Sequence, residues 1–190
     1  MNIVIAGSGA MGCRFGWRLH HAGHELRLID HWQQHVEAIR AGGLEVKTEN
    51  GICTAKIPAS FPCDSKGTAE LLIVFTKAMQ TENMVASCRH LIGEKTWVLT
   101  LQNGLGNIEI IEKYVPRNRI LAGVTTLTAE LLAPGKIQAL GSGITEIMRV
   151  EGETSAEVEE IARIMNEAGL NVVVSPHALI SIWNKVAFNC

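Results

Sequence analysis

Short apolar runs alternate with segments of helical periodicity over the first two thirds of the chain. The apolar runs predict strands at 2–6, 25–29, 71–75 and 96–101. The segments with apolar residues three and four apart predict helices at 10–22, 31–41, 79–92 and 107–114. This alternation is typical of an α/β fold of the Rossmann type, a doubly wound and mostly parallel sheet.

The rhythm is interrupted in two places. Residues 44–47 and 52–57 flank Asn50-Gly51, a dipeptide that favours a β-hairpin. After about residue 117 no helix separates the apolar runs, so we expect extra antiparallel strands in the same sheet. These runs lie at 120–128, 136–140 and 145–150.

The last segment predicts the start of a second domain. A helix at 155–168 and a strand at 171–174 complete the dinucleotide-binding domain, residues 1–174. Ser175 then suits an N-cap and Pro176 a first helical position. The helical pattern continues to Cys190 with no glycine or proline stop signal, so we expect 175–190 to begin a truncated C-terminal helical domain.

Composition narrows the class of protein. A hydrophobic content of 47% suits a sheet buried on both faces. The net charge of −2 does not indicate the positively charged surface that binds nucleic acid. The sequence shows no signal-peptide pattern and no apolar run long enough to cross a bilayer, so we expect no membrane partner. The five cysteines lack a C-x-x-C pair, which favours reduced thiols in a cytoplasmic protein.

A glycine-rich loop joins the first strand to the first helix. Gly7 permits the turn, Gly9 lets a pyrophosphate approach the backbone, and Gly12 allows close packing of helix and strand. The helix N-terminus favours the phosphate charge. The pattern predicts a dinucleotide site formed by Gly7, Ser8, Gly9, Ala10, Met11 and Gly12.

Asp30 ends the second predicted strand. An acid at this position binds the adenosine ribose hydroxyls and repels a 2′-phosphate, which favours NADH over NADPH. No Arg or Lys follows before Arg40, so an obvious clamp for a 2′-phosphate is lacking. Asp30 and Gln33 also form a capping-box pattern, and the two roles are compatible.

Two further polar residues follow predicted parallel strands. Lys77 and Asn103 are expected at the carboxyl edge of the sheet, where ligands of such folds bind. The alternatives are a solvated lysine at a helix start and an ordinary turn at Asn103-Gly104.

The final helix carries a polar stripe. Ser181, Lys185 and Asn189 are spaced four residues apart, so a lysine and an asparagine could protonate and orient a carbonyl group. A plain solvated face is the alternative. A separate apolar stripe comprises Leu179, Trp183, Val186 and Cys190.

His31 and His35 are four residues apart, a spacing that can bind metal. No third ligand accompanies them, so the pattern favours a surface helix face and no metal site.

Taken together, these motifs resemble those of the ketopantoate reductase family over essentially the whole chain. They are IAGSGAMG at 5–12, TKA at 76–78, QNGLG at 102–106 and WNKVAFNC at 183–190. The resemblance implies reduction of ketopantoate to D-pantoate with NAD(P)H, in pantothenate biosynthesis. It implies that Lys185 is the general acid, that Asn103 lies beside nicotinamide and substrate, that Lys77 lies near the cofactor, and that Asn189 contacts substrate.

Asp30 departs from the basic residue that family members using NADPH commonly carry there. This difference favours NADH as the cofactor. It also suggests an alternative function, that of an NAD-dependent D-2-hydroxyacid dehydrogenase acting on other branched or aromatic 2-keto acids. A non-catalytic dinucleotide-binding fragment is a further alternative. Apolar surface on a truncated helical domain would offer a route to a homodimer.

Overall fold

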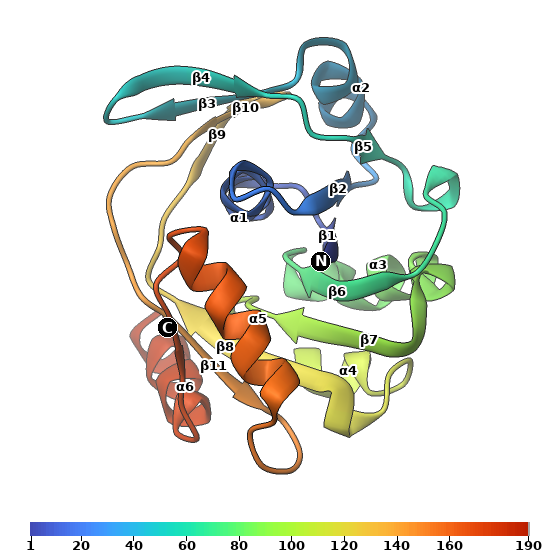
Figure 1. Ribbon diagram of the computed structural model, residues 1–190, viewed down its shortest axis with the longest axis vertical. Helices are drawn as coiled ribbons and strands as arrows, with labels where there is room; N and C mark the ends of the chain where they lie inside the picture. The colour runs from blue at the N-terminus through green and yellow to red at the C-terminus, as the bar shows by residue number, and fades with distance from the viewer. Residues whose placement is uncertain (190) are drawn as a thin grey trace.

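The computed structural model describes residues 1–189, which form one large sheet flanked by helices and one small sheet (Figure 1). The large sheet has the strand order β12-β11-β8-β7-β6-β1-β2-β5. The neighbouring strands β8, β7, β6, β1, β2 and β5 pair in parallel. By contrast, β11 runs antiparallel to β8 and pairs in parallel with β12. The strands are β1 (Asn2–Ala6), β2 (Glu25–Ile29), β5 (Ala59–Ser60), β6 (Ala69–Val74), β7 (Ile92–Thr100), β8 (Ile120–Thr125), β11 (Thr145–Arg149) and β12 (Val172–Val174).

Both faces of this sheet are buried. In β1, Ile3 and Ile5 pack into a cluster on one face with Phe15 of α1, while Val4 packs on the other with Met84 of α3. Burial on both faces explains why the sequence of β1 is a continuous apolar run after Asn2. The helices are α1 (Ala10–His21), α2 (Gln33–Gly42), α3 (Thr81–Ser87), α4 (Asn107–Ile111), α5 (Ala156–Glu167) and α6 (Ala178–Asn189).

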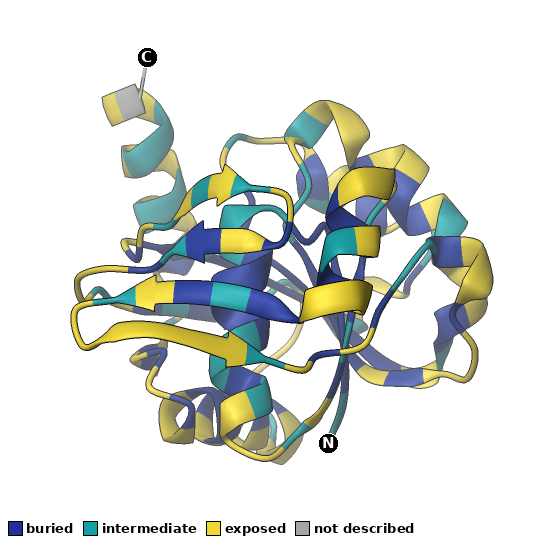
Figure 2. Cartoon of the chain, turned by 90° about the horizontal axis from the view of Figure 1, so that it is seen from above, coloured by how far each residue is buried: buried dark blue, intermediate teal, exposed yellow. Residues whose placement is uncertain are grey.

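The small sheet has the order β4-β3-β10-β9 and stands apart from the large one (Figure 1). Its strands are β3 (Leu44–Thr48), β4 (Gly51–Ala55), β9 (Glu130–Ala133) and β10 (Lys136–Gln138). The expected β3–β4 hairpin is present, and β4 is the exposed edge strand (Figure 2). The expectation that 136–140 extends the large sheet is wrong, because β10 pairs in parallel with the free edge of β3.

Arg14 of α1 holds the two segments that lead to the small sheet. Its buried guanidinium donates hydrogen bonds to the carbonyl oxygens of Thr128, Leu140 and Gly141, the last two at 2.7 Å and 2.6 Å. The small sheet is therefore tied to the same helix that begins at the glycine loop.

Several helix boundaries differ from the sequence expectation. The helix expected at 79–92 is a short α3 between two single 3₁₀ turns, Ala78–Gln80 and Arg89–Leu91. The last helix begins at Ala178 instead of Pro176, because the Ser175 hydroxyl accepts the His177 N–H and closes a turn first. Among residues 1–189, no helix has the length and apolarity needed to cross a membrane.

Candidate functional site

The glycine loop has the geometry that its three glycines require. Gly7 has φ +97°, and a Cβ there would lie 2.7 Å from the backbone nitrogen of Thr76. A Cβ at Gly12 would lie 2.0 Å from the carbonyl oxygen of Gly7. At Gly9, by contrast, no described atom comes within 4 Å of the Cβ position, so the backbone is open to a ligand.

A groove of about 550 Å³ runs past this loop. Gly9 is the N-cap of α1, and neither a capping side chain nor an acidic residue of the first turn occupies the helix N-terminus. Its N–H groups are thus available to an anion. The groove is lined by Gly7, Gly9, Asp30, His31, Trp32, Phe75, Thr76, Lys77, Gln80, Asn83, Met84 and Leu131.

The Asp30 carboxylate is anchored to the glycine loop. Oδ2 accepts hydrogen bonds from the backbone N–H of Ser8 at 2.7 Å and from the Ser8 hydroxyl at 3.2 Å. Oδ1 accepts the N–H of Trp32 at 3.0 Å. The capping-box alternative is wrong, since α2 begins at Gln33 with Trp32 as its N-cap and no side-chain cap.

Lys77 lies on the opposite wall of the groove. It is exposed, precedes the 3₁₀ turn Ala78–Gln80, and follows Thr76 at the end of β6. Its position agrees with the sequence expectation that it faces the groove. The remaining loop residues, Ala10 and Met11, form the first turn of α1.

Asn103 and Lys185 line one cavity of about 280 Å³. Asn103 is exposed in the loop after β7, and Lys185 is half-buried on α6. Gly123 of β8 lines the same cavity. The tertiary structure thus brings together the two residues that the sequence singled out from distant segments.

Lys185 is held against the sheet. Its Nζ donates a 2.8 Å hydrogen bond to the carbonyl oxygen of Thr125, at the end of β8. Burial lowers the pKa of Lys185 below its ordinary value, because a partly desolvated ammonium is less stable. A lysine in this state gives up its proton more readily than one in water.

Ser181 and Lys185, two residues of the polar stripe of α6, face the sheet. Hydrogen bonds from the Ser175 and Ser181 hydroxyls lower the pKa of Glu146 on β11. Leu179 and Trp183 are 42% and 55% exposed, so the expected apolar stripe is not the buried face. The side chain of Asn189, and Cys190 entirely, lie outside the described residues.

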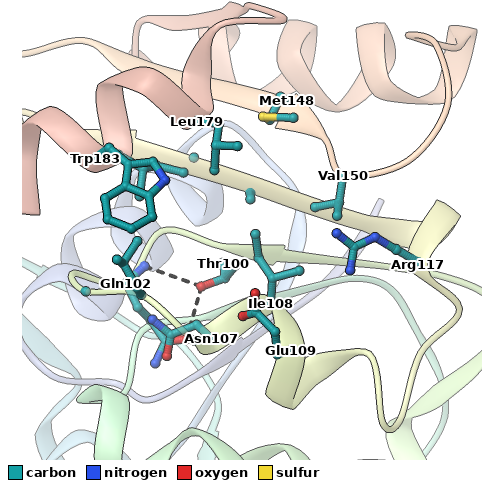
Figure 3. A pocket seen from close by; sticks show the side chains of 16 residues that line it. Thr100, Gln102, Asn107, Ile108, Glu109, Arg117, Met148, Val150, Leu179 and Trp183 are labelled. Atoms are coloured by element: carbon teal, nitrogen blue, oxygen red, sulfur yellow. Dashed lines mark hydrogen bonds between the residues drawn. The ribbon is translucent and has the colours of Figure 1, made fainter.

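A second cavity of about 250 Å³ adjoins that of Asn103 and Lys185 (Figure 3). The two share the wall residues Gln102, Gly104, Gly123 and Ile182. Leu179 and Trp183 reach over it from α6, opposite Ile108 of α4, while Met148 and Val150 line the sheet side. The cavity is predominantly apolar.

A buried polar network links the strand ends beneath these cavities. Gln102 Nε2 donates to the carbonyl oxygen of Thr76 at 2.6 Å and to Thr81 Oγ1 at 2.8 Å, and Thr81 Oγ1 donates to Asn107 Oδ1 at 2.9 Å. The Thr100 hydroxyl donates to Gln102 Oε1 at 3.0 Å. Sequence reasoning noted Gln102 only as a neighbour of Asn103. Gln102 directly follows a buried apolar run in the sequence, and this position could have indicated a buried polar residue at the end of a strand.

His35 is not on a surface face, contrary to expectation. It is fully buried, whereas His31 is exposed and precedes α2. Among the described residues, no group of three or more His, Cys, Asp or Glu side chains is placed to hold a metal ion.

A comparison with known families matches most of the chain. The family described as ketopantoate reductase PanE/ApbA matches residues 3–152. The chain belongs to the ketopantoate reductase family. The match includes the glycine loop, Asp30 and Asn103, and it ends before α6.

Individual relatives extend the similarity over the whole chain. The 2-dehydropantoate 2-reductase of Lactococcus lactis is 41% identical over 191 residues, and that of Streptococcus pyogenes is 38% identical over 189 residues. Each comparison covers 100% of this chain but 61% of the relative, so the chain spans about three fifths of these proteins.

Solved structures of similar proteins agree with the fold. A ternary structure of D-mandelate dehydrogenase with NADH and anilino(oxo)acetate superposes with a TM-score of 0.96 at 40% identity. The 2-dehydropantoate 2-reductase of Geobacter metallireducens gives a TM-score of 0.91 at 28% identity. These comparisons cover 100% of this chain and 61% or 62% of the other. The expected Rossmann-type fold is confirmed.

Proposed function

We propose that this chain carries the dinucleotide site and the proton donor of an NAD(P)H-dependent 2-keto acid reductase. The observation that carries the proposal is the shared cavity of Asn103 and Lys185 beside the glycine-loop groove. Gln102 joins the two, because it lines the cavity and hydrogen-bonds Thr76 of the groove. Residues 1–174 are assigned to dinucleotide binding, and 175–190 to the start of a helical substrate domain.

The groove fits a dinucleotide. The open backbone at Gly9 and the uncapped N-terminus of α1 suit a pyrophosphate, and the Asp30 carboxylate retains lone pairs for ribose hydroxyls. Lys77 on the facing wall would add positive charge beside the phosphates. Asp30 would repel a 2′-phosphate, so we assign NADH as the preferred cofactor. The D-mandelate dehydrogenase relative is also described with NADH.

Lys185 is assigned as the general acid. Nicotinamide, when bound, supplies the hydride to the carbonyl carbon of the substrate. Lys185 then transfers a proton to the carbonyl oxygen, and the Thr125 carbonyl keeps the ammonium directed at the cavity. Asn103 is assigned to orient nicotinamide and substrate, and Asn189, one helical turn after Lys185, to substrate binding.

Ketopantoate is the first substrate candidate, since the relatives from L. lactis and S. pyogenes are 2-dehydropantoate 2-reductases. The apolar cavity beside Lys185 favours a second candidate, an NAD-dependent D-2-hydroxyacid dehydrogenase for branched or aromatic 2-keto acids. Its volume of about 250 Å³ exceeds the roughly 150 Å³ of a cavity that accepts benzene. The similarity to D-mandelate dehydrogenase points the same way.

A turnover assay with NADH tests the proposal and ranks the substrates. Ketopantoate, 2-ketoisovalerate and phenylglyoxylate would be compared by kcat/KM. We expect Lys185→Ala to lower kcat by about 10²- to 10⁴-fold with NADH affinity unchanged. Asn184→Ala, an exposed neighbour on α6, is the matched control and should retain kcat.

Two outcomes would contradict parts of this proposal. Unchanged turnover in Lys185→Ala would remove the lysine from the mechanism. NADH binding with no turnover on any 2-keto acid would favour the third candidate, a dinucleotide-binding module without catalysis.

A further inference from the structure

His35 of α2 lies directly behind the glycine loop and is fully buried. Its Nδ1 accepts a 3.1 Å hydrogen bond from the backbone N–H of Gly135. A backbone N–H can only donate, so Nδ1 carries no proton and the neutral ring is protonated at Nε2. Nε2 lies 3.5 Å from Cys13 Sγ, on the first helix after the loop.

The first route from His35 to the groove passes through Cys13. The thiol donates a 2.9 Å hydrogen bond to the carbonyl oxygen of Ser8. Burial, together with the nearby Asp30 carboxylate, raises the pKa of Cys13, so the sulfur keeps the proton that it donates. Ser8 in turn donates its N–H and hydroxyl to Asp30 Oδ2.

The second route passes through Trp32. Its indole stacks on the imidazole of His35, with ring centroids 5.1 Å apart and an interplanar angle of 9°. The backbone N–H of Trp32 donates to Asp30 Oδ1 at 3.0 Å. Both oxygens of the Asp30 carboxylate therefore accept hydrogen bonds from residues linked to the His35 imidazole: Ser8 through Cys13, and Trp32 by direct stacking.

The third route reaches the small sheet. Gly135 forms the turn between β9 and β10, and Leu131 of β9 lines the dinucleotide groove. The hydrogen bond from Gly135 to His35 thus positions this wall relative to the loop. His35 connects three walls of the groove without lining it.

We propose that neutral His35 is a positioning residue for the dinucleotide groove, and that protonation of its imidazole weakens dinucleotide binding. This inference rests on the proposed function, since it concerns the same groove. A proton on Nδ1 would remove the acceptor for Gly135 and place two N–H groups against each other. The positions of Leu131 and Asp30 in the groove would then be less firmly fixed.

The electrostatic surroundings set the direction of the effect. Burial lowers the pKa of His35 below its ordinary 6.5, and the Asp30 carboxylate and a hydrogen bond with the Ser8 backbone oppose this shift only partly. From α1 the facing titratable group is the Cys13 thiol, from the end of β2 it is Asp30, and the β9–β10 turn presents the backbone of Gly135. A ligand that binds the neutral form must bind less tightly as pH falls through the pKa of His35, which lies below 6.5.

NADH titrations at pH 7.5 and pH 5.5 test the proposal. Wild type should bind NADH more weakly at pH 5.5 than at pH 7.5, by less than the roughly tenfold that an imidazole of ordinary pKa would give. In His35→Asn, whose Oδ1 can still accept the Gly135 N–H but cannot titrate, this loss should disappear. In His31→Asn, which removes the exposed histidine of the groove, the wild-type loss should persist.

Each result has one reading. Absence of NADH binding at pH 7.5 in wild type overturns the proposed function and this inference with it. Binding at pH 7.5 with no loss at pH 5.5, or a loss abolished by His31→Asn alone, overturns only the role of His35. If His35→Asn does not fold, NMR titration of the wild-type imidazole decides: its pKa should fall when NADH is added, and an unchanged value overturns the inference.

Discussion

The backbone N–H of Ser8 donates a 2.7 Å hydrogen bond to Oδ2 of Asp30, 22 residues further along the chain. This bond connects the turn after β1 to the end of β2 and holds the carboxylate at the glycine loop. A carboxylate fixed in that place can accept ribose hydroxyls and repel a 2′-phosphate. Its charge is the basis of the first prediction.

Replacing Asp30 should relax the choice of cofactor. We expect wild type to bind NADH more tightly than NADPH, and Asp30→Ala to lose NADH affinity by about tenfold, the effect of losing charged hydrogen bonds. Asp30→Asn keeps an acceptor for Ser8 but lacks the charge, so it should gain NADPH affinity with a smaller loss for NADH. Dissociation constants from fluorescence titrations check this. A wild-type preference for NADPH would contradict the role given to Asp30.

Alanine at Gly12 should affect stability, whereas alanine at Gly9 should affect NADH binding. In Gly12→Ala the new Cβ would meet the Gly7 carbonyl oxygen at 2.0 Å, so α1 must shift. We expect a loss of about 1–3 kcal/mol in the free energy of unfolding, or more. Gly9→Ala meets no described atom within 4 Å and should leave stability unchanged while weakening NADH binding. Thermal unfolding and NADH titration of both variants measure the contrast, and equal stability of the two would refute it.

Gln102 and Asn103 are neighbours that we expect to act differently. Gln102→Leu removes the donor to the Thr76 carbonyl oxygen and the acceptor of the Thr100 hydroxyl, and should cost about 1–3 kcal/mol in denaturant unfolding. Asn103 is exposed, so Asn103→Ala should change stability by less than about 0.5 kcal/mol. Its effect should appear in turnover. A large stability loss in Asn103→Ala would instead make this residue part of the framework.

The pH dependence of turnover should report the state of Lys185. The ammonium is the active acid, so kcat/KM is full at low pH and is lost as pH rises through the pKa of the lysine. Because burial lowers the pKa of Lys185, the alkaline limb should lie below the ordinary 10.5. Lys185→Arg, whose guanidinium does not titrate in this range, should keep a low rate without that limb. A wild-type profile that stays flat up to pH 10.5 would argue against the assignment.

The elements predicted best are those whose signal is local. The strand expected at 2–6 is β1, which is buried and apolar after Asn2, and the strand expected at 25–29 is β2, where the apolar residues Leu26, Leu28 and Ile29 are the buried ones. β9 was missed: its residues are exposed or only half-buried, so no buried run marks it. The start of α6 was misplaced because a Ser-Pro pair suits a turn as well as a helix.

The sequence by itself determined the nature of the site: three glycines in fixed steric roles, an acid at the end of β2, and a lysine on the last helix. Backbone geometry and side-chain chemistry are properties of a few adjacent residues, so a motif can reveal them. Only the tertiary structure decided that Asn103 and Lys185 share a cavity, that Ser181 and Lys185 of α6 face the sheet, and that His35 is buried with its Nδ1 on the Gly135 N–H. Such contacts join residues from distant segments, and they form because the packing of the whole sheet and its helices places those segments side by side.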